Sequence, residues 1–331
     1  MSIVKTPADL VSAVPFLVGY HPENSLVVIS VKDDALNMAM RVDLPEANTP
    51  AKAFDTLASH LKRDEAECAL IVAYSDDREA NERVLNEMLN ACTRAEILVK
   101  EAMEVRANRY RSVICKDEEC CPVDGNEMPD FKSARITAEQ VADGKVLPFE
   151  SSEGLTASLS SNELATDKDF HDLVKSIINA ENIENKGEFT NEFQRKGAEA
   201  LEQMKLLFSF DSEISNELKA QIIAGVQDIQ VRDYALGLFN ECEVGKNFYL
   251  SLFKSAPQEF AHPLASLASA YAYESGEGAL AQRLLDKAIE ADPDYSLARL
   301  LRRVFSSGWS PTGFAQLRAE LHPRVTATIF G

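Results

Sequence analysis

The chain has 331 residues, of which 45% are hydrophobic, so we expect about two globular domains with sizeable cores. Its formal net charge of −19 is spread evenly, with 27 acidic against 17 basic residues in 1–150 and 26 against 17 in 151–331. Binding to nucleic acid or to anionic lipid draws on clustered Lys and Arg, so this charge argues against both kinds of partner.

The N-terminal residues carry no basic region of the kind that begins a secretion signal. No stretch approaches the roughly 18 apolar residues of a membrane span. We therefore expect a cytoplasmic protein. Six cysteines are too few for a disulfide framework, and a cytoplasm would keep most of them reduced.

The first predicted element is a helix that begins after Thr6. Thr6 can cap it, Pro7 suits its first position, and Asp9 favours its positive end. Pro15 and Gly19 are expected to end it.

A polar turn follows at residues 19–25 and leads into a buried strand. Pro22 pushes the residue before it into an extended conformation. Residues 26–31 are apolar and β-branched, which predicts a central strand. Residues 32–34 then predict a hairpin turn, and residues 35–44 a returning strand.

Helices and strands continue to alternate up to residue 115. Helical spacing marks residues 51–61 and 78–89, and strand patterns mark 68–74, 97–105 and 109–115. This order predicts an α/β domain, a mixed sheet with covering helices, over residues 1–135.

The turn at 19–25 holds the first group of candidate catalytic residues. His21 and Ser25 offer a base and a hydroxyl, and Arg41 and Asp43 share one face of the returning strand. A structural corner and an internal ion pair explain the same residues, and the sequence contains no nucleophile elbow, P-loop or dinucleotide fingerprint. We therefore expect no cofactor.

Three cysteines form the second group of candidates, Cys115, Cys120 and Cys121. Reduced structural thiols, a redox disulfide and a metal site are the alternatives. Zinc sites commonly use four ligands in two spaced pairs, whereas here four residues and then none separate the cysteines. A metal is therefore the weakest of the three, and we expect the acidic residues 117–119 to raise the thiol pKa values.

The C-terminal region is predicted to be an all-α domain over residues 169–331, after a connector at 136–168. Helical spacing marks residues 193–210, 214–226 and 231–239. Residues 262–301 resemble one tetratricopeptide repeat, because Ala281, Leu285, Ala288 and Pro293 fall at its small, bulky, small and proline positions. The first helix of this hairpin departs from the repeat pattern, and no second copy follows. An ordinary helical hairpin in a bundle therefore explains the same residues as well as a peptide-binding repeat does.

Several short segments together resemble an uncharacterised actinobacterial family, a domain of unknown function. They include Gly19-Tyr20-His21-Pro22 running into Ser25-Leu26-Val27-Val28, Arg41-Val42-Asp43-Leu44-Pro45, Cys120-Cys121-Pro122, Val231-Arg232-Asp233 and Asp292-Pro293-Asp294-Tyr295. This chain departs from the family at residues 109–111, where a tryptophan is usual beside the serine. The resemblance implies a bacterial cytoplasmic protein and supplies no activity.

Two functions remain open at this point. The first is a non-enzymatic adaptor that holds another protein through the helical C-terminal domain. The second is an enzyme or small-ligand-binding protein with a site at the 19–25 loop, near Arg41, Asp43 and the 115–121 segment. The lack of a complete catalytic motif favours the adaptor.

Overall fold

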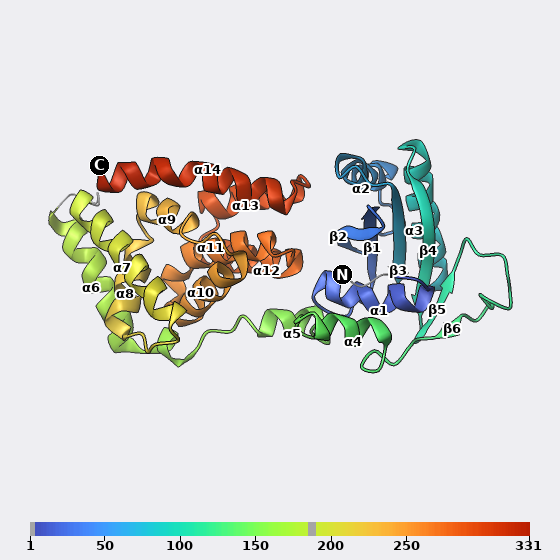
Figure 1. Cartoon of the computed structure of the whole chain (residues 1–331), viewed down its shortest axis with the longest axis horizontal. Coiled ribbons are helices and arrows are strands. Elements are labelled where there is room, and N and C mark those ends of the chain that lie inside the picture. Colours follow the sequence, from blue (N-terminus) through green and yellow to red (C-terminus); the bar gives the residue numbers. More distant parts are fainter. Residues whose placement is uncertain (1–3, 185–189) are drawn as a thin grey trace. The chain divides into compact units, whose positions relative to one another are not determined.

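The computed structural model describes residues 4–184 and 190–331 and divides into two compact units, Met1–Leu155 and Thr156–Gly331 (Figure 1). Unit 1 is a mixed sheet with helices, and unit 2 is helical. The predicted fold class is confirmed. Within the described ranges, no helix is both long enough and apolar enough to cross a membrane.

The sheet of unit 1 has six strands in the order β2-β1-β3-β4-β5-β6. The strands are β1 (Ser25–Lys32), β2 (Ala35–Asp43), β3 (Cys68–Tyr74), β4 (Leu98–Arg106), β5 (Arg109–Ser112) and β6 (Asn126–Glu127). Only β3 and β4 pair in parallel; the other neighbours are antiparallel. Asp33 and Asp34 both have positive φ, as a tight hairpin turn between β1 and β2 requires.

The strands at the centre of the sheet are buried on both faces. Side chains alternate between the faces, so Leu26 and Val28 of β1 pack with helices α2 (Ala51–Arg63) and α3 (Arg78–Arg94). Val27 and Ile29 point to the opposite face and are equally buried. The sequences of these strands are continuous apolar runs because both faces of the sheet are covered by helices or loops.

Helix α1 (Pro7–Val18) begins as predicted and ends later than Pro15. Thr6 and Asp9 form a reciprocal capping box. Pro15 lies inside the helix, so the expectation that it ends the helix is wrong. A proline in the last turn removes only one helical hydrogen bond, and Gly19, with φ of 87°, ends the helix.

Part of the predicted connector packs onto unit 1. It forms α4 (Arg135–Ala142) and α5 (Ser152–Ala157). Ile136 and Leu155 are buried, and the Arg135 guanidinium lies 2.7 Å from the Asp9 carboxylate on α1. Composition indicated a connector with a few short apolar segments, and Ile136 and Leu155 belong to those segments.

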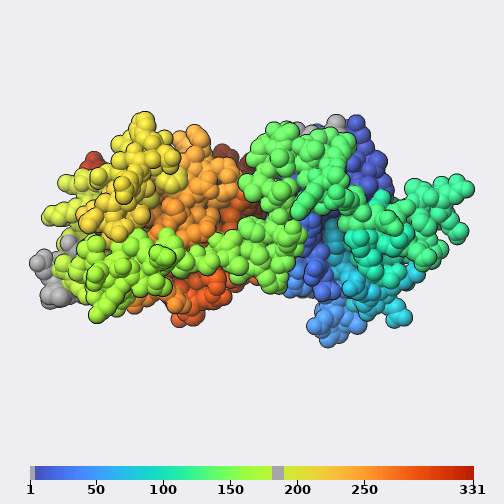
Figure 2. Space-filling model, turned by 90° about the horizontal axis from the view of Figure 1, so that it is seen from below, coloured from blue at the N-terminus to red at the C-terminus, as the bar shows by residue number. Residues whose placement is uncertain are grey.

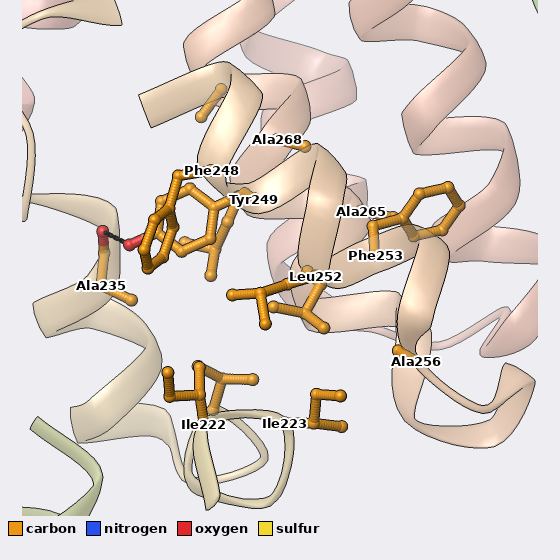
Figure 3. Close-up of a cluster of buried hydrophobic side chains, with 14 of the residues drawn as sticks. Ile222, Ile223, Ala235, Phe248, Tyr249, Leu252, Phe253, Ala256, Ala265 and Ala268 are labelled. Atoms are coloured by element: carbon orange, nitrogen blue, oxygen red, sulfur yellow. Dashed lines mark hydrogen bonds between the residues drawn. The ribbon is translucent and has the colours of Figure 1, made fainter. Parts of the chain in front are cut away.

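Unit 2 is built from helices around one hydrophobic core, part of which Figure 3 shows. Its elements are η1 (Glu163–Thr166), α6 (Lys168–Glu184), α7 (Asn191–Ser209), α8 (Asn216–Gly225), α9 (Ile229–Leu236), α10 (Cys242–Ser255), η2 (Gln258–Phe260), α11 (Ala261–Glu274), α12 (Gly278–Ala291), α13 (Ser296–Ser306) and α14 (Pro311–Phe330). In the core, the Tyr249 hydroxyl donates a 2.6 Å hydrogen bond to the Ala235 carbonyl.

Arg318 on α14 and Glu274 on α11 form a buried ion pair in unit 2. The two side chains are 5% and 3% exposed. Their atoms form two bonds, Nε to Oε1 at 2.6 Å and Nη2 to Oε2 at 2.8 Å. The pair ties the last helix to the centre of the unit.

Candidate functional site

The three cysteines lie on the segment that joins β5 to β6, in the blue-green lobe at the right of Figure 2. Arg109 holds the end of this segment, because its guanidinium donates to the carbonyl oxygens of Asp124 and Gly125. The Asn126 amide donates to the Cys120 carbonyl at 2.9 Å. Residues of β5 and β6 therefore anchor the second half of this loop at Cys120 and at Asp124–Gly125.

A turn at Asp117 folds the segment back on itself. The Asp117 carbonyl accepts a 2.8 Å hydrogen bond from the Cys121 backbone N–H. Its carboxylate accepts from the N–H groups of Glu119 and Cys120 at 2.9 and 3.4 Å. Asp side chains favour such turns because they can bond to the backbone two or three residues later. The turn returns Cys120 and Cys121 to the neighbourhood of Cys115.

The Sγ atoms of Cys115, Cys120 and Cys121 all lie within 4.8 Å of one another. The Sγ atoms of Cys120 and Cys121 are 3.9 Å apart, and all three cysteines are free thiols. Two thiolates on a tetrahedral zinc ion stand about 3.8 Å apart, given Zn–S bonds of about 2.3 Å. The cluster is thus close to the spacing that one ion requires.

Burial is the main influence on the Cys121 thiol and raises its pKa to about 11. The neighbouring thiols Cys115 and Cys120 raise this pKa further, and a backbone hydrogen bond from Ser112 lowers it. Burial also raises the pKa of Tyr110, and the charges of Cys121 and Cys120 add to that rise. Tyr110 pairs across the strands with Asn126, whose amide donates to the Cys120 carbonyl, so it lies next to the cluster.

Ser112 connects the cluster to the sheet. Its hydroxyl accepts a 3.1 Å hydrogen bond from the Cys115 backbone N–H and donates to the Glu101 carboxylate at 2.6 Å. Sequence reasoning did not assign roles to Ser112, Tyr110 or Asn126. The only signal was their position on strands next to the cysteines, where alternation places Tyr110 and Ser112 on the same face.

Ser25, Arg41 and Asp43 of the first candidate group meet at one end of the β1–β2 hairpin. Ser25 is fully buried, and its hydroxyl donates to the Glu23 carbonyl and accepts a 2.8 Å bond from Arg41 Nε. Arg41 Nη1 lies 2.6 Å from the Asp43 carboxylate. These bonds occupy the polar groups of the turn, which favours a structural corner.

His21 has different neighbours. Its ring meets the Phe131 ring edge-on at 4.5 Å, and its backbone N–H donates to the Phe149 carbonyl at 3.0 Å. Burial lowers the His21 pKa, and the Glu150 charge opposes that change. A cavity of about 580 Å³ lies elsewhere, in unit 2, between Asp167, His171 and Glu259.

A family described as "Domain of unknown function (DUF4192)" matches residues 7–312. No curated protein and no solved structure matches the chain.

Proposed function

We propose that this chain, which belongs to the DUF4192 family of domains of unknown function, binds a soft metal ion such as Zn²⁺ through the thiolates of Cys115, Cys120 and Cys121. The observation that carries the proposal is the convergence of the three Sγ atoms to within 4.8 Å. Thiolates are the donors that select zinc and copper(I) over harder cations such as Mg²⁺ or Ca²⁺.

A metal accounts for this geometry better than a disulfide does. A disulfide uses two sulfurs and leaves the third without a role, and one of the possible pairs joins adjacent residues. A metal ion uses all three. It also offsets the high pKa of Cys121, because binding replaces the thiol protons with a cation.

Metal analysis and thiol counting on anaerobically purified protein test the proposal. We expect one equivalent of zinc, or its uptake from added zinc, and protection of three thiols from alkylation. Removing one thiolate in C115S, C120S or C121S should weaken zinc binding beyond the ~100-fold that loss of an outer-shell partner can cost. The control is C242S, which removes a half-buried thiol in unit 2. Zinc binding that these three substitutions leave unchanged would contradict the proposal.

The helical unit favours a second function, an adaptor that holds another protein. The supporting observation is that Ala281, Leu285 and Ala288, which carry the repeat resemblance, are fully buried in the α11–α12 hairpin. Residues 156–331 have a core of their own and can serve as bait against a native lysate. If the bait recovers no protein above background, while the full chain does, the helical unit is not the binding surface.

A further inference from the structure

We infer that a metal ion at the cysteine cluster keeps one exchangeable coordination position, and that this position takes a neutral nitrogen donor of the imidazole type in preference to an anion. The inference rests on the proposed function, since it concerns the same ion. It goes further by assigning the chemistry of the ligand that the ion would accept.

The exchangeable position follows from the number of donors. Within the described residues, the Cys, His, Asp and Glu side chains that gather at this point are the three cysteines alone. A tetrahedral ion needs four donors, and structural zinc sites supply all four from protein. Sites with three protein ligands bind water or a substrate in the fourth position.

Exposure makes the fourth position accessible. Cys120 is exposed and Cys115 is half-buried, whereas Cys121 is buried. An ion held by all three sulfurs therefore has protein on the Cys121 side and solvent on the Cys120 side. A small ligand can reach it without displacing the core.

Charge determines which ligand is favoured. Three thiolates around a divalent ion leave a net charge of −1. The same loop carries exposed Asp117, Glu118, Glu119 and Asp124 against the single cation Lys116, a further net charge of −3. A negatively charged ligand meets repulsion from both sources, whereas a neutral nitrogen donor meets none.

Tyr110 is the protein group best placed to compete with an external ligand. It pairs across the strands with Asn126 of β6, whose amide holds the Cys120 carbonyl. We therefore assign Tyr110 a positioning role, as an O–H that donates to a sulfur or to the fourth ligand.

Cobalt(II) bound anaerobically to the full chain separates these possibilities. The sulfur-to-cobalt charge-transfer band reports the thiolates, and the d–d bands report the fourth ligand. We expect imidazole to shift the d–d bands saturably while the charge-transfer band keeps its intensity. Azide should bind several-fold more weakly, and E118Q/E119Q should strengthen azide binding at low salt without changing the response to imidazole.

Each contrary result has a separate meaning. Absence of the charge-transfer band would overturn the proposed function itself. A charge-transfer band with no response to imidazole would overturn only the exchangeable position. If Y110F then does respond to imidazole, the phenol oxygen of Tyr110 fills that position in the wild type. Azide binding that E118Q/E119Q does not strengthen would overturn the role given to charge.

Discussion

Replacing Arg318 with methionine should destabilise unit 2 severely. Methionine fills part of the space and provides no hydrogen-bond donors. It leaves the Glu274 carboxylate buried at 3% exposure without its bidentate partner. Breaking a buried ion pair by removing one member costs about 3–5 kcal/mol.

Other contacts of Arg318 add to this cost. Its Nη1 donates to the Phe239 carbonyl at 2.8 Å and the Leu236 carbonyl at 3.0 Å, and its guanidinium lies 4.5 Å from the centre of the Tyr271 ring. Nη1 also donates to the Tyr271 hydroxyl at 3.1 Å. That hydroxyl keeps a bond from the Phe239 N–H, and the Leu236 carbonyl keeps a bond from the hydroxyl, so the Phe239 carbonyl is the acceptor most affected. A lost bond of this kind adds about 1 kcal/mol. The total is at least about 4 kcal/mol, or a melting temperature lower by about 8–16 °C for a unit of this size.

Trp309 makes the assay specific, because it is the only tryptophan in the chain and belongs to unit 2. Urea unfolding followed by tryptophan fluorescence therefore reports this unit. The double variant E274L/R318M should recover part of the loss, because it no longer buries an unpaired charge. A loss below about 1 kcal/mol in R318M, typical of an exposed ion pair, would refute the reasoning.

Three smaller changes test other contacts. In G125A the new Cβ would stand 2.9 Å from the Tyr110 carbonyl oxygen and would force this end of the cysteine loop to shift. Zinc affinity, measured by chelator competition, should therefore fall about 10-fold. G144A is the control, because Gly144 has a similar positive φ and open space around it. S25A removes the bonds to Arg41 and the Glu23 carbonyl and should cost about 1–3 kcal/mol in unit 1, and an unchanged urea midpoint would contradict this role. Burial alone would raise the Asp9 pKa, but hydrogen bonds and charge from Arg135 lower it overall. Stability from Asp9 is therefore present above its usual pKa and is lost as pH falls through the lower pKa of the folded state. The urea midpoints of wild type and D9N should converge as the pH is lowered. A difference in midpoint that stays constant with pH would exclude this linkage.

Much of the fold was predictable because each signal was local. The capping box at Thr6 and Asp9 needs only neighbouring residues, and the hairpin needs only the turn at Asp33 and Asp34. Packing of α4 on α1 was not predictable, because it depends on Ile136 and on an ion pair between Arg135 and Asp9, which are far apart in the sequence. Long-range contacts of this kind leave no periodic pattern.

The first candidate group shows why shared chemistry in a short segment does not establish a site. Ser25, Arg41 and Asp43 do meet, since β1 and β2 pair Ser25 with Asp43. Their polar atoms bond chiefly to one another and to the turn. His21 packs instead against Phe131, which lies more than a hundred residues along the chain. The sequence could indicate which chemical groups are present but not which partners they bond to in the folded chain.

The cysteines present the opposite case, because linear spacing argued against a site that folding makes geometrically possible. The usual sign of zinc in a sequence is a pair of ligands separated by two to four residues. Here Asp117 forms the turn that returns Cys120 and Cys121 to Cys115, and its carboxylate accepts bonds from backbone N–H groups of that turn. Burial and the neighbouring thiols, rather than the acidic residues, are the main causes of the raised Cys121 pKa. Because binding of a metal must displace those protons, the affinity of the cluster for zinc should rise steeply with pH, and more steeply than in C115S.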